Sequence, residues 1–478
     1  MTTSPPAQTT LEDLAPAIES AGQGHLLTFV GELSREGKAA FACQLSGVDW
    51  EALPGVIERY RQAGAAEVLD GLEPPLVCGV NGISGDHALD AAEARAAGLE
   101  MVKAGKVAAL TVAGGQGTRL GFEGPKGTLP IGPASGRTLF EIFADQLRAA
   151  GEWSGRPIPW LIMTSPQNHQ QTLSFFEDRD WLGLDRDQLR FFQQGVMPSF
   201  CPQTGRLLLA GKGELATNPD GHGGVIRALV RSQELDRLER EGVEHLSYFQ
   251  VDNPLVTPID PVFLGGHAGA GGTVSSGEFS SKMVAKANPG EKVGVFARSD
   301  GRTRVVEYSD LPEELASATD VQGRLRFEAG SVAIHAASVA FLRSVEDAGE
   351  AALPFHRAFK KVPHIDVQTG EHIEPGEPNA VKLERFVFDA IPVAKTSMVL
   401  RVERDREFAP TKNPTGVDSV ESARHMQSKR AEAWLRERGH DVPAGCTLEL
   451  SGAAAWADAA GLDYTPATPL QAGQAVVL

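Results

Sequence analysis

The sequence predicts an α/β fold built on an open, mostly parallel, Rossmann-like sheet. Between residues 106 and 395, short apolar runs alternate with helix-like segments such as "TLFEIFADQLRAA". Alternation of this kind is typical of parallel sheets with helical crossovers. A second observation is that the first apolar run leads directly into the glycine-rich turn "AGGQGTRLG". Ligands of open sheets bind beyond the carboxyl ends of the strands, so this turn marks an expected binding site.

The predicted strands are short and apolar, as buried strands are. In chain order they are "KVAALTVAGG", "IPWLIMTS", "LRFFQQG", "HLSYFQVDN", "KVGVFARSDG" and "RTRVVEYSD". Helix-like stretches such as "GVIRALVRSQELDRLERE" separate several of them. No internal repeat interrupts the pattern.

Four regions are expected along the chain. Its 478 residues exceed the size that one hydrophobic core usually reaches. Residues 1–10 are interpreted as a disordered tail, and 11–105 as a helical N-terminal region, because Ala, Glu, Leu and Arg recur there at helical spacing. Residues 106–395 form the central α/β domain. Residues 396–478 hold one charged helix followed by "CTLELSG" and "QAVVL", which predict a small β-containing C-terminal domain.

Composition excludes several classes of protein. The 45 basic and 62 acidic residues give a formal charge of −17, which disfavours non-specific binding of nucleic acid. The four cysteines are far apart and form no C-x-x-C pair, which argues against a zinc site and fits a reducing compartment. A signal peptide and a long apolar run are both missing from the sequence. We therefore expect a cytoplasmic protein without nucleic-acid or membrane partners, either monomeric or weakly homo-oligomeric.

The glycine-rich turn fits neither of two common nucleotide-binding templates. The Rossmann fingerprint needs a third glycine where Leu120 stands, and Walker A needs its lysine directly after a glycine, whereas Lys126 follows a proline. Glycines still let backbone N–H groups approach a phosphate. Arg119 and Lys126 add positive charge that backbone amides cannot supply. A polyphosphate is the ligand that this combination predicts.

At this point the sequence resembles the UDP-sugar pyrophosphorylases, and most closely the eukaryotic-type UDP-N-acetylglucosamine pyrophosphorylases. The family signature L-x-x-G-G-x-G-T-R-L-G followed by P-K matches Leu110 to Lys126. Further matches occur in the same order over roughly residues 105–425. They include "MTSPQNH", "FFQQGVMP", "PDGHGGVIRAL", "FQVDNPLV", "SKMVAKANPGEKVGVF", "FEAGSVAIH", "KKVPHID", "NAVKLERFVFD" and "REFAPTKN".

The resemblance implies a GT-A-like nucleotidyltransferase as the central domain. The implied reaction joins UTP and a sugar 1-phosphate into a UDP-sugar, with release of pyrophosphate by direct in-line displacement. N-acetylglucosamine 1-phosphate is the first expected substrate. A UTP–glucose-1-phosphate uridylyltransferase or a broad UDP-sugar pyrophosphorylase is the alternative.

The resemblance also implies roles for individual residues on the nucleotide side. Arg119 would face the departing phosphates, and Lys126 the α-phosphate. Lys382 and Lys412 match phosphate-gripping lysines, although most exposed lysines only interact with solvent. Asp252 would bind Mg²⁺, the expected cofactor, although a carboxylate after a strand can also cap a turn. The implied nucleotide contacts are Ala113, Gly114, Gly115, Gly117, Lys126, Gln194, Gly221, Asp252 and Lys382.

On the sugar side, the resemblance implies Glu307, Phe386, His222 and Ser331 as contacts. His222 and Ser331 depart from the N-acetylglucosamine enzymes, which carry asparagine at both positions. Histidine at the first position is closer to the glucose enzymes, so these two residues favour the alternative sugar. The remaining histidines considered are interpreted as core or surface residues, namely His335, His356, His364 and His372.

Two other classes of protein compete with a transferase. A dehydrogenase would need the third glycine and an acidic residue near the end of the second strand to hold ribose. A non-catalytic uridine-binding protein would lose the charged residues, but the chain retains all of them. Both alternatives are disfavoured on these grounds.

Overall fold

The protein is described from a computed structural model that covers residues 9–61, 71–80, 85–465 and 470–478. Two compact units divide the chain, and each is assembled from three separate stretches. Unit 1 comprises Met1–Val68, Gly195–Gly224 and Pro354–Phe386. Unit 2 comprises Leu69–Gln194, Val225–Leu353 and Val387–Leu478.

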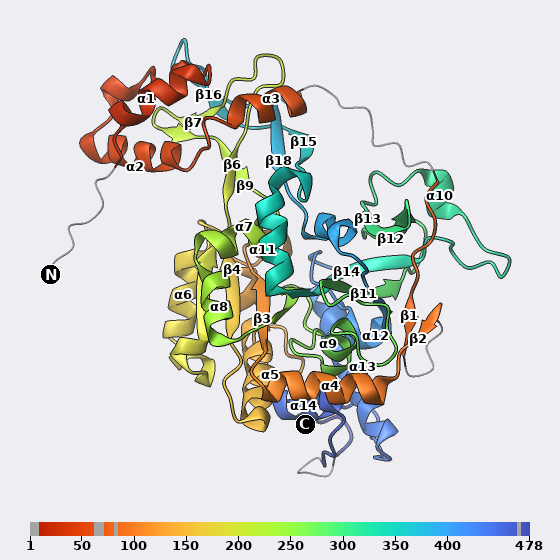
Figure 1. Cartoon of the computed structure of the whole chain (residues 1–478). Helices are drawn as coiled ribbons and strands as arrows, with labels where there is room; N and C mark the ends of the chain where they lie inside the picture. Colours follow the sequence, from red (N-terminus) through yellow and green to blue (C-terminus); the bar gives the residue numbers. More distant parts are fainter. Residues whose placement is uncertain (1–8, 62–70, 81–84, 466–469) are drawn as a thin grey trace. The chain divides into compact units, whose positions relative to one another are not determined.

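Unit 2 is built on a large, mainly parallel sheet, which confirms the predicted fold class (Figure 1). Its main path runs β2-β1-β19-β11-β14-β10-β3-β4-β5, and β12 and β13 form a hairpin on β14. The strands are β1 (Cys78–Gly79), β2 (His87–Ala88), β3 (Val107–Val112), β4 (Trp160–Thr164), β5 (Leu189–Gln193), β10 (His245–Gln250), β11 (Phe279–Ala285), β12 (Val295–Ser299), β13 (Arg302–Val306), β14 (Ala329–Ser338) and β19 (Val399–Arg401).

Strand β14 is the antiparallel exception along the main path of this sheet. It pairs antiparallel with β10 on one side and β11 on the other, whereas β10, β3, β4 and β5 are parallel neighbours. The parallel strands end at the same edge of the sheet, so the residues that follow β3 and β10 are neighbours. This geometry brings the glycine-rich turn next to the residues after β10.

Helices complete unit 2. They are α4 (Ala91–Lys103), α5 (Leu139–Ser154), α6 (His169–Glu177), α7 (Gly224–Arg231), α8 (Glu234–Glu241), α9 (Pro261–His267), α10 (Glu313–Ser317), α11 (Val339–Ala348), α12 (Arg404–Glu407), α13 (Val420–Glu437) and α14 (Gly452–Ala460). Several begin with the side-chain caps that stabilise helix N-termini, as when Thr138 and Glu141 form a capping box on α5. The predicted C-terminal β element is present as the parallel pair β20 (Thr447–Glu449) and β21 (Ala475–Val477).

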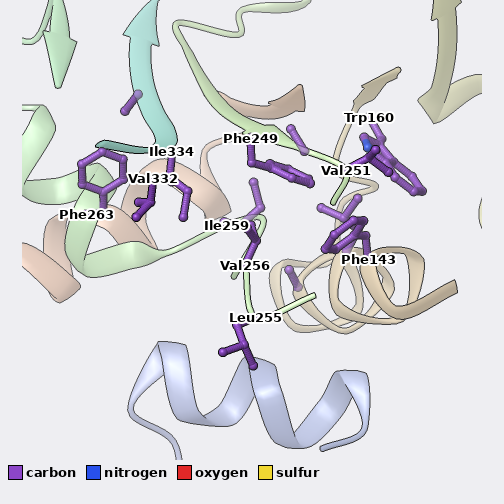
Figure 2. Packing of buried hydrophobic residues seen from close by; sticks show 14 of the residues in the cluster. Phe143, Trp160, Phe249, Val251, Leu255, Val256, Ile259, Phe263, Val332 and Ile334 are labelled. Atoms are coloured by element: carbon purple, nitrogen blue, oxygen red, sulfur yellow. The ribbon is translucent and has the colours of Figure 1, made fainter. Parts of the chain in front are cut away.

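Apolar side chains from the sheet and the helices form the core of unit 2. Figure 2 shows Phe249 and Val251, at the end of β10, close to Phe143 of α5 and Trp160 of β4. The rings of Phe143 and Phe249 lie 5.0 Å apart in an edge-to-face arrangement. Trp160 donates its indole N–H to the Thr111 hydroxyl at 2.8 Å, so this buried polar group is satisfied. The core therefore packs against the carboxyl ends of β3 and β10.

Unit 1 combines the N-terminal helices with short strands from two later stretches. Its helices are α1 (Leu11–Ser20), α2 (Arg35–Ser46) and α3 (Leu53–Arg61). Its strands are β6 (Val196–Pro198), β7 (Leu209–Gly211), β8 (Glu214–Leu215), β9 (Thr217–Pro219), β15 (His356–Lys360), β16 (His364–Ile365), β17 (His372–Ile373) and β18 (Ala380–Glu384). One apolar cluster joins the helices to the strands through Phe41, Phe200 and Val381.

The compact units cut across the continuous regions expected from the sequence. Strands β1 and β2 fall within the predicted helical region, and β19 lies beyond residue 396, yet all three join the central sheet. The N-terminal helices share a core with strands near residues 200 and 380. Non-local pairing of this kind leaves no periodic signal in the sequence. Most of the predicted disordered tail lies outside the described residues, and Thr10 caps α1.

Within the residues that the structure describes, every helix is too short or too polar to cross a bilayer.

Helices α4 and α9 cross closely because glycines face each other's backbone (Figure 1). A methyl group added to Gly98 would overlap the Pro261 carbonyl, and one added to Gly265 would overlap the Ala94 carbonyl. Gly98→Ala should therefore lower the urea midpoint of unfolding, with a cost of about 1–3 kcal/mol or more because backbone must move.

Gly55→Ala in α3 is the control, since its added methyl group meets nothing within 4 Å. It should leave the midpoint unchanged or raise it slightly, as expected for alanine in an open helix position. Unfolding is monitored by circular dichroism. An unchanged urea midpoint for Gly98→Ala would show that α4 and α9 can move apart without a loss of stability.

Candidate functional site

The glycine loop, residues 113–126, follows β3 and folds back on itself. The amide of Lys126 donates to the Gly115 carbonyl at 3.0 Å, and the amide of Gly117 donates to the Gly124 carbonyl at 2.9 Å. Asn168, just before α6, is fully buried and donates to the Ala113 carbonyl at 2.9 Å and the Gly115 carbonyl at 3.3 Å. The loop thus has a fixed conformation that Asn168 holds from the side.

Gln194 lies against the start of this loop. Its backbone N–H donates to the Thr164 carbonyl at 2.8 Å, and its side chain is buried. A methyl group on Gly114 would overlap the Gln194 side-chain oxygen, so the absence of a side chain at Gly114 lets the Gln194 amide group approach the loop backbone closely. The structure therefore brings together two residues predicted to contact the nucleotide.

Lys126 and Asp252, both predicted to act at the phosphates of the nucleotide, form an ion pair that we name the phosphate-site pair after that prediction. The Lys126 Nζ lies 3.4 Å from the Asp252 Oδ2 and donates to the Thr411 carbonyl at 3.2 Å. Both side chains are mostly buried, with 17% and 13% exposed. The Thr411 amide donates to the Asp252 carbonyl at 2.9 Å, and its hydroxyl does so at 3.1 Å. Three segments that are distant in sequence therefore converge at the ends of β3 and β10.

Lys412 directly follows Thr411, on the loop that leads from α12 to α13. The amides of Lys412 and Asn413 both donate to the Asp418 carbonyl, at 2.7 and 2.9 Å. The Lys412 side chain is exposed next to the buried Thr411. Arg119 is also exposed, within the short helix η3 (Thr118–Leu120). Both cations are therefore accessible to an anion from solvent.

Two residues predicted to contact the sugar flank Gly294. The Ser331 amide of β14 donates to the Gly294 carbonyl at 2.8 Å. Glu307 follows β13, and its carboxylate lies next to Gly294, since a methyl group there would be 3.5 Å from the Oε1. Residues 295 and 330 pair between β12 and β14, which fixes this arrangement.

In unit 1, the segments 220–224 and 384–386 are locked together through their backbones. The Arg385 amide donates to the Asp220 carbonyl at 2.8 Å, and the Gly223 amide donates to the Arg385 carbonyl at 2.8 Å. Gly221 has a φ of +84°, and a methyl group there would overlap the Arg385 backbone. Only glycine permits this approach.

The locked segments carry a stack of aromatic rings. The His222 ring stacks on the Phe386 ring with centroids 5.2 Å apart, and the His356 ring stacks on Phe386 at 4.3 Å. Burial, with a smaller effect of the His356 imidazole, lowers the pKa of His222 to about 4. The imidazole of His222 is therefore neutral at pH 7, so it suits a hydroxyl or amide group better than a phosphate. Lys382 lies on β18 of the same unit, opposite Ala358 of β15.

The predicted site residues are divided between the two units. Unit 2 holds Arg119, Lys126, Gln194, Asp252, Glu307, Ser331, Lys412 and the loop glycines, and unit 1 holds Gly221, His222, Lys382 and Phe386. Sequence reasoning missed Asn168 and Thr411, although both stand in the segments "MTSPQNH" and "APTKN" that carried the resemblance. It interpreted His356 as a core or surface residue, and the structure shows a half-buried ring that stacks on Phe386.

Comparison with known proteins decides the family. The family model described as UTP–glucose-1-phosphate uridylyltransferase, UDPGP, matches residues 84–441. The chain belongs to this family. The predicted resemblance is therefore confirmed, and so is the class of enzyme, a UDP-sugar pyrophosphorylase.

Relatives within the UDPGP family cover most of the chain. UDP-N-acetylglucosamine pyrophosphorylase of Saccharomyces cerevisiae is 36% identical over 369 residues, which span 75% of this chain and 76% of the yeast protein. UDP-N-acetylhexosamine pyrophosphorylase-like protein 1 of Xenopus tropicalis is 37% identical over 434 residues, 88% of this chain and 83% of its own. The crystal structure of the Trypanosoma brucei UDP-N-acetylglucosamine pyrophosphorylase is similar with a TM-score of 0.75 and 25% identity, and covers 95% of this chain and 94% of its own.

The neutral His222 predicts a pH dependence of stability. In the unfolded chain a histidine takes up a proton near pH 6.5, whereas folded His222 does so only near pH 4. The unfolded state therefore binds more protons between these values, and the unfolding free energy should fall as the pH decreases from 6.5 to 4. The fully buried His267, whose pKa burial lowers to about 3, adds to this fall.

The contribution of His222 can be separated by substitution. His222→Phe keeps a stackable ring without a titrating group, so urea unfolding at pH 7 and pH 5 should show a smaller difference than in the wild type. His372→Gln, at an exposed histidine, should not change that difference. Equal pH dependence in wild type and His222→Phe would contradict the neutral imidazole.

Proposed function

We propose that this protein transfers a uridylyl group from UTP to a sugar 1-phosphate, with N-acetylglucosamine 1-phosphate as its main substrate. The observation that carries the proposal is the convergence of Lys126, Asp252 and Thr411 at the ends of two parallel strands. Membership of the UDPGP family supports the reaction, and the names of the yeast and Trypanosoma brucei relatives support the sugar.

The reaction needs cations and precise positioning rather than a general base. The nucleophile is a sugar phosphate oxygen, which is already anionic at neutral pH. The barrier lies in bringing two anions together and in stabilising the charge on the leaving pyrophosphate. A preorganised ammonium group answers both needs, because it does not have to be oriented during the reaction.

Lys126 would neutralise the α-phosphate, and Arg119 would bind the leaving pyrophosphate. In the structure Lys126 is already fixed by Asp252 and the Thr411 carbonyl, so little conformational entropy is lost on binding. Lys412, at the exposed position after Thr411, would add a further cation. These interactions would be strongest when charge on the phosphates is greatest, and would act mainly on kcat.

Mg²⁺ is proposed as the cofactor, with Asp252 as its protein ligand. The carboxylate is only 13% exposed but has a cation as its neighbour, so an ion could replace or supplement that contact. No group of three or more His, Cys, Asp or Glu side chains among the described residues could hold a metal alone. Mg²⁺ commonly binds one or two carboxylates and completes its shell with phosphate oxygens and water. Bound there, it would supply charge neutralisation for the triphosphate.

The alternative is a preference for glucose 1-phosphate or a relaxed specificity. The observation that favours it is His222, whose neutral imidazole stands in the "GHGG" segment. An imidazole offers one donor and one acceptor in a ring, whereas an asparagine offers an amide that reaches further. An unsatisfied polar group on the substrate costs about 1–3 kcal/mol, enough to decide between the two sugars.

Substitution of the loop cations tests the proposed reaction. Lys126→Ala and Arg119→Ala should each reduce the kcat for pyrophosphate release on the order of 10²-fold or more, as for loss of a preorganised transition-state donor. Lys103→Ala, at an exposed lysine of α4 paired with Glu100, should retain wild-type turnover. The assigned roles are wrong if both loop variants keep full activity with UTP, Mg²⁺ and a hexose 1-phosphate.

The sugar is identified by a substrate panel. Pyrophosphate release should be fastest with N-acetylglucosamine 1-phosphate, compared with the 1-phosphates of N-acetylgalactosamine, glucose and galactose, and faster with UTP than with dTTP. His222→Asn should raise kcat/KM for N-acetylglucosamine 1-phosphate relative to glucose 1-phosphate by about 5- to 100-fold, the equivalent of one polar contact. A higher kcat/KM for glucose 1-phosphate in the wild type would select the alternative.

A further inference from the structure

A buried lysine outside the predicted site links two carboxylates in unit 2. Lys282, in the middle of β11, is 1% exposed. Its Nζ donates to the Asp260 Oδ2 at 2.6 Å and to the two Glu407 carboxylate oxygens at 2.8 and 3.0 Å. Burial disfavours the ammonium, but the two carboxylates outweigh it and raise the pKa of Lys282. The lysine therefore stays charged inside the protein.

The sheet is irregular where this lysine lies. Ser281 pairs with His335 and Met283 pairs with Ser331, so three residues of β14 lie opposite Lys282 alone. One of them, Ala333, has a φ of +54°, a strained value for a residue with a side chain. Bulges of this kind are common next to functional sites, where they redirect a side chain.

The two carboxylates lead to different parts of the molecule. Asp260 caps the N-terminus of α9, where its Oδ1 accepts from the amides of Val262 and Phe263. Glu407 ends α12 and begins the segment that runs to Lys412. The contact of Lys282 with Asp260 therefore stabilises helix α9. Its contact with Glu407, which we name the Glu407 arm, leads to the segment that carries Thr411 and Lys412.

Asn253 ties the Glu407 arm to the phosphate-site pair. Its side-chain N–H donates to the Glu407 carbonyl at 2.7 Å, and its side-chain oxygen accepts from the Ala409 amide at 3.0 Å. Asn253 directly follows Asp252, whose carbonyl accepts from the amide and the hydroxyl of Thr411. Each link is a hydrogen bond between largely buried groups, so a shift at Glu407 is transmitted to Asp252.

We infer that Lys282 is a positioning residue, which holds the phosphate-site pair in its working arrangement through Glu407. The inference rests on the proposed function, since it concerns the same phosphate site. Lys282 does not touch the phosphate-site pair itself. Its contribution is to fix residues 407–412 against the end of β10, because misplacement of reacting groups by about 1 Å can cost 10²-fold in rate.

Matched substitutions of the two carboxylates separate positioning from general stability. Lys282→Met would leave two buried carboxylates without a cation, so it is a poor test of function. Glu407→Gln and Asp260→Asn each remove one negative charge from the same lysine and keep a hydrogen-bond acceptor. Asparagine can still cap α9. Both variants should unfold at similarly lower urea concentrations, but only Glu407→Gln changes the arm that reaches the site.

The readouts are kcat for pyrophosphate release and the Kd for UTP with Mg²⁺, measured by calorimetry on folded protein. Glu407→Gln should lower kcat by roughly 10- to 100-fold and weaken UTP binding by about tenfold, whereas Asp260→Asn should change both by less than about twofold. Equal losses in the two variants, or unchanged kcat and Kd in Glu407→Gln, would overturn the inference.

Calorimetry also keeps the inference separate from the proposed function. A wild-type protein that binds UTP but releases no pyrophosphate would refute the proposed reaction. In that case a selective loss of UTP affinity in Glu407→Gln would still support the positioning role, and equal affinities in both variants would still refute it.

Discussion

The ammonium group of Lys126 is the point on which the proposed phosphate site depends. It is held between the Asp252 carboxylate and the Thr411 carbonyl, which come from two other stretches of chain. A lysine on a flexible loop would lose considerable side-chain entropy on binding a phosphate. Here the loop is closed by its own backbone hydrogen bonds and by Asn168, so most of that cost is met on folding. The parallel arrangement of β3 and β10 makes this possible, because it brings the residues after both strands to one edge.

Charge in this site is balanced locally, in a protein of net charge −17. An acidic surface repels a triphosphate at long range, but ions at physiological salt screen that repulsion beyond about 8 Å. Attraction within the site acts over a few ångströms between partly buried groups, where screening is weak. The affinity for an anionic substrate is therefore set by a few side chains, and the overall charge of the chain has little influence on it.

Much of the fold and part of the site could be predicted from residues that are close in sequence. The apolar runs before "AGGQGTRLG" and "VDN" identified β3 and β10, and the polar residues that follow them identified the glycine loop and Asp252. The antiparallel strand β14 was not among the predicted strands, because its pairing depends on partners 44 to 93 residues away, from Ala285↔Ala329 to His245↔Ser338. The stacking of His356 on Phe386 could not be predicted for the same reason. Nothing near His356 in the sequence shows that its ring lies on Phe386, and only the antiparallel pairing of β15 with β18 brings the two together.

The discontinuous unit 1 has a consequence for synthesis of the chain on the ribosome. Its apolar cluster needs Leu11, Phe41 and Trp50 from the beginning of the chain, and Phe355, Val381 and Leu383 from much later. At about 5–20 residues per second, translation reaches the last of these only some tens of seconds after the first helices emerge. The apolar faces of the nascent N-terminal helices therefore stay exposed to solvent while most of unit 2 is synthesised. Chaperones that bind exposed apolar segments have their main opportunity on this protein during that interval.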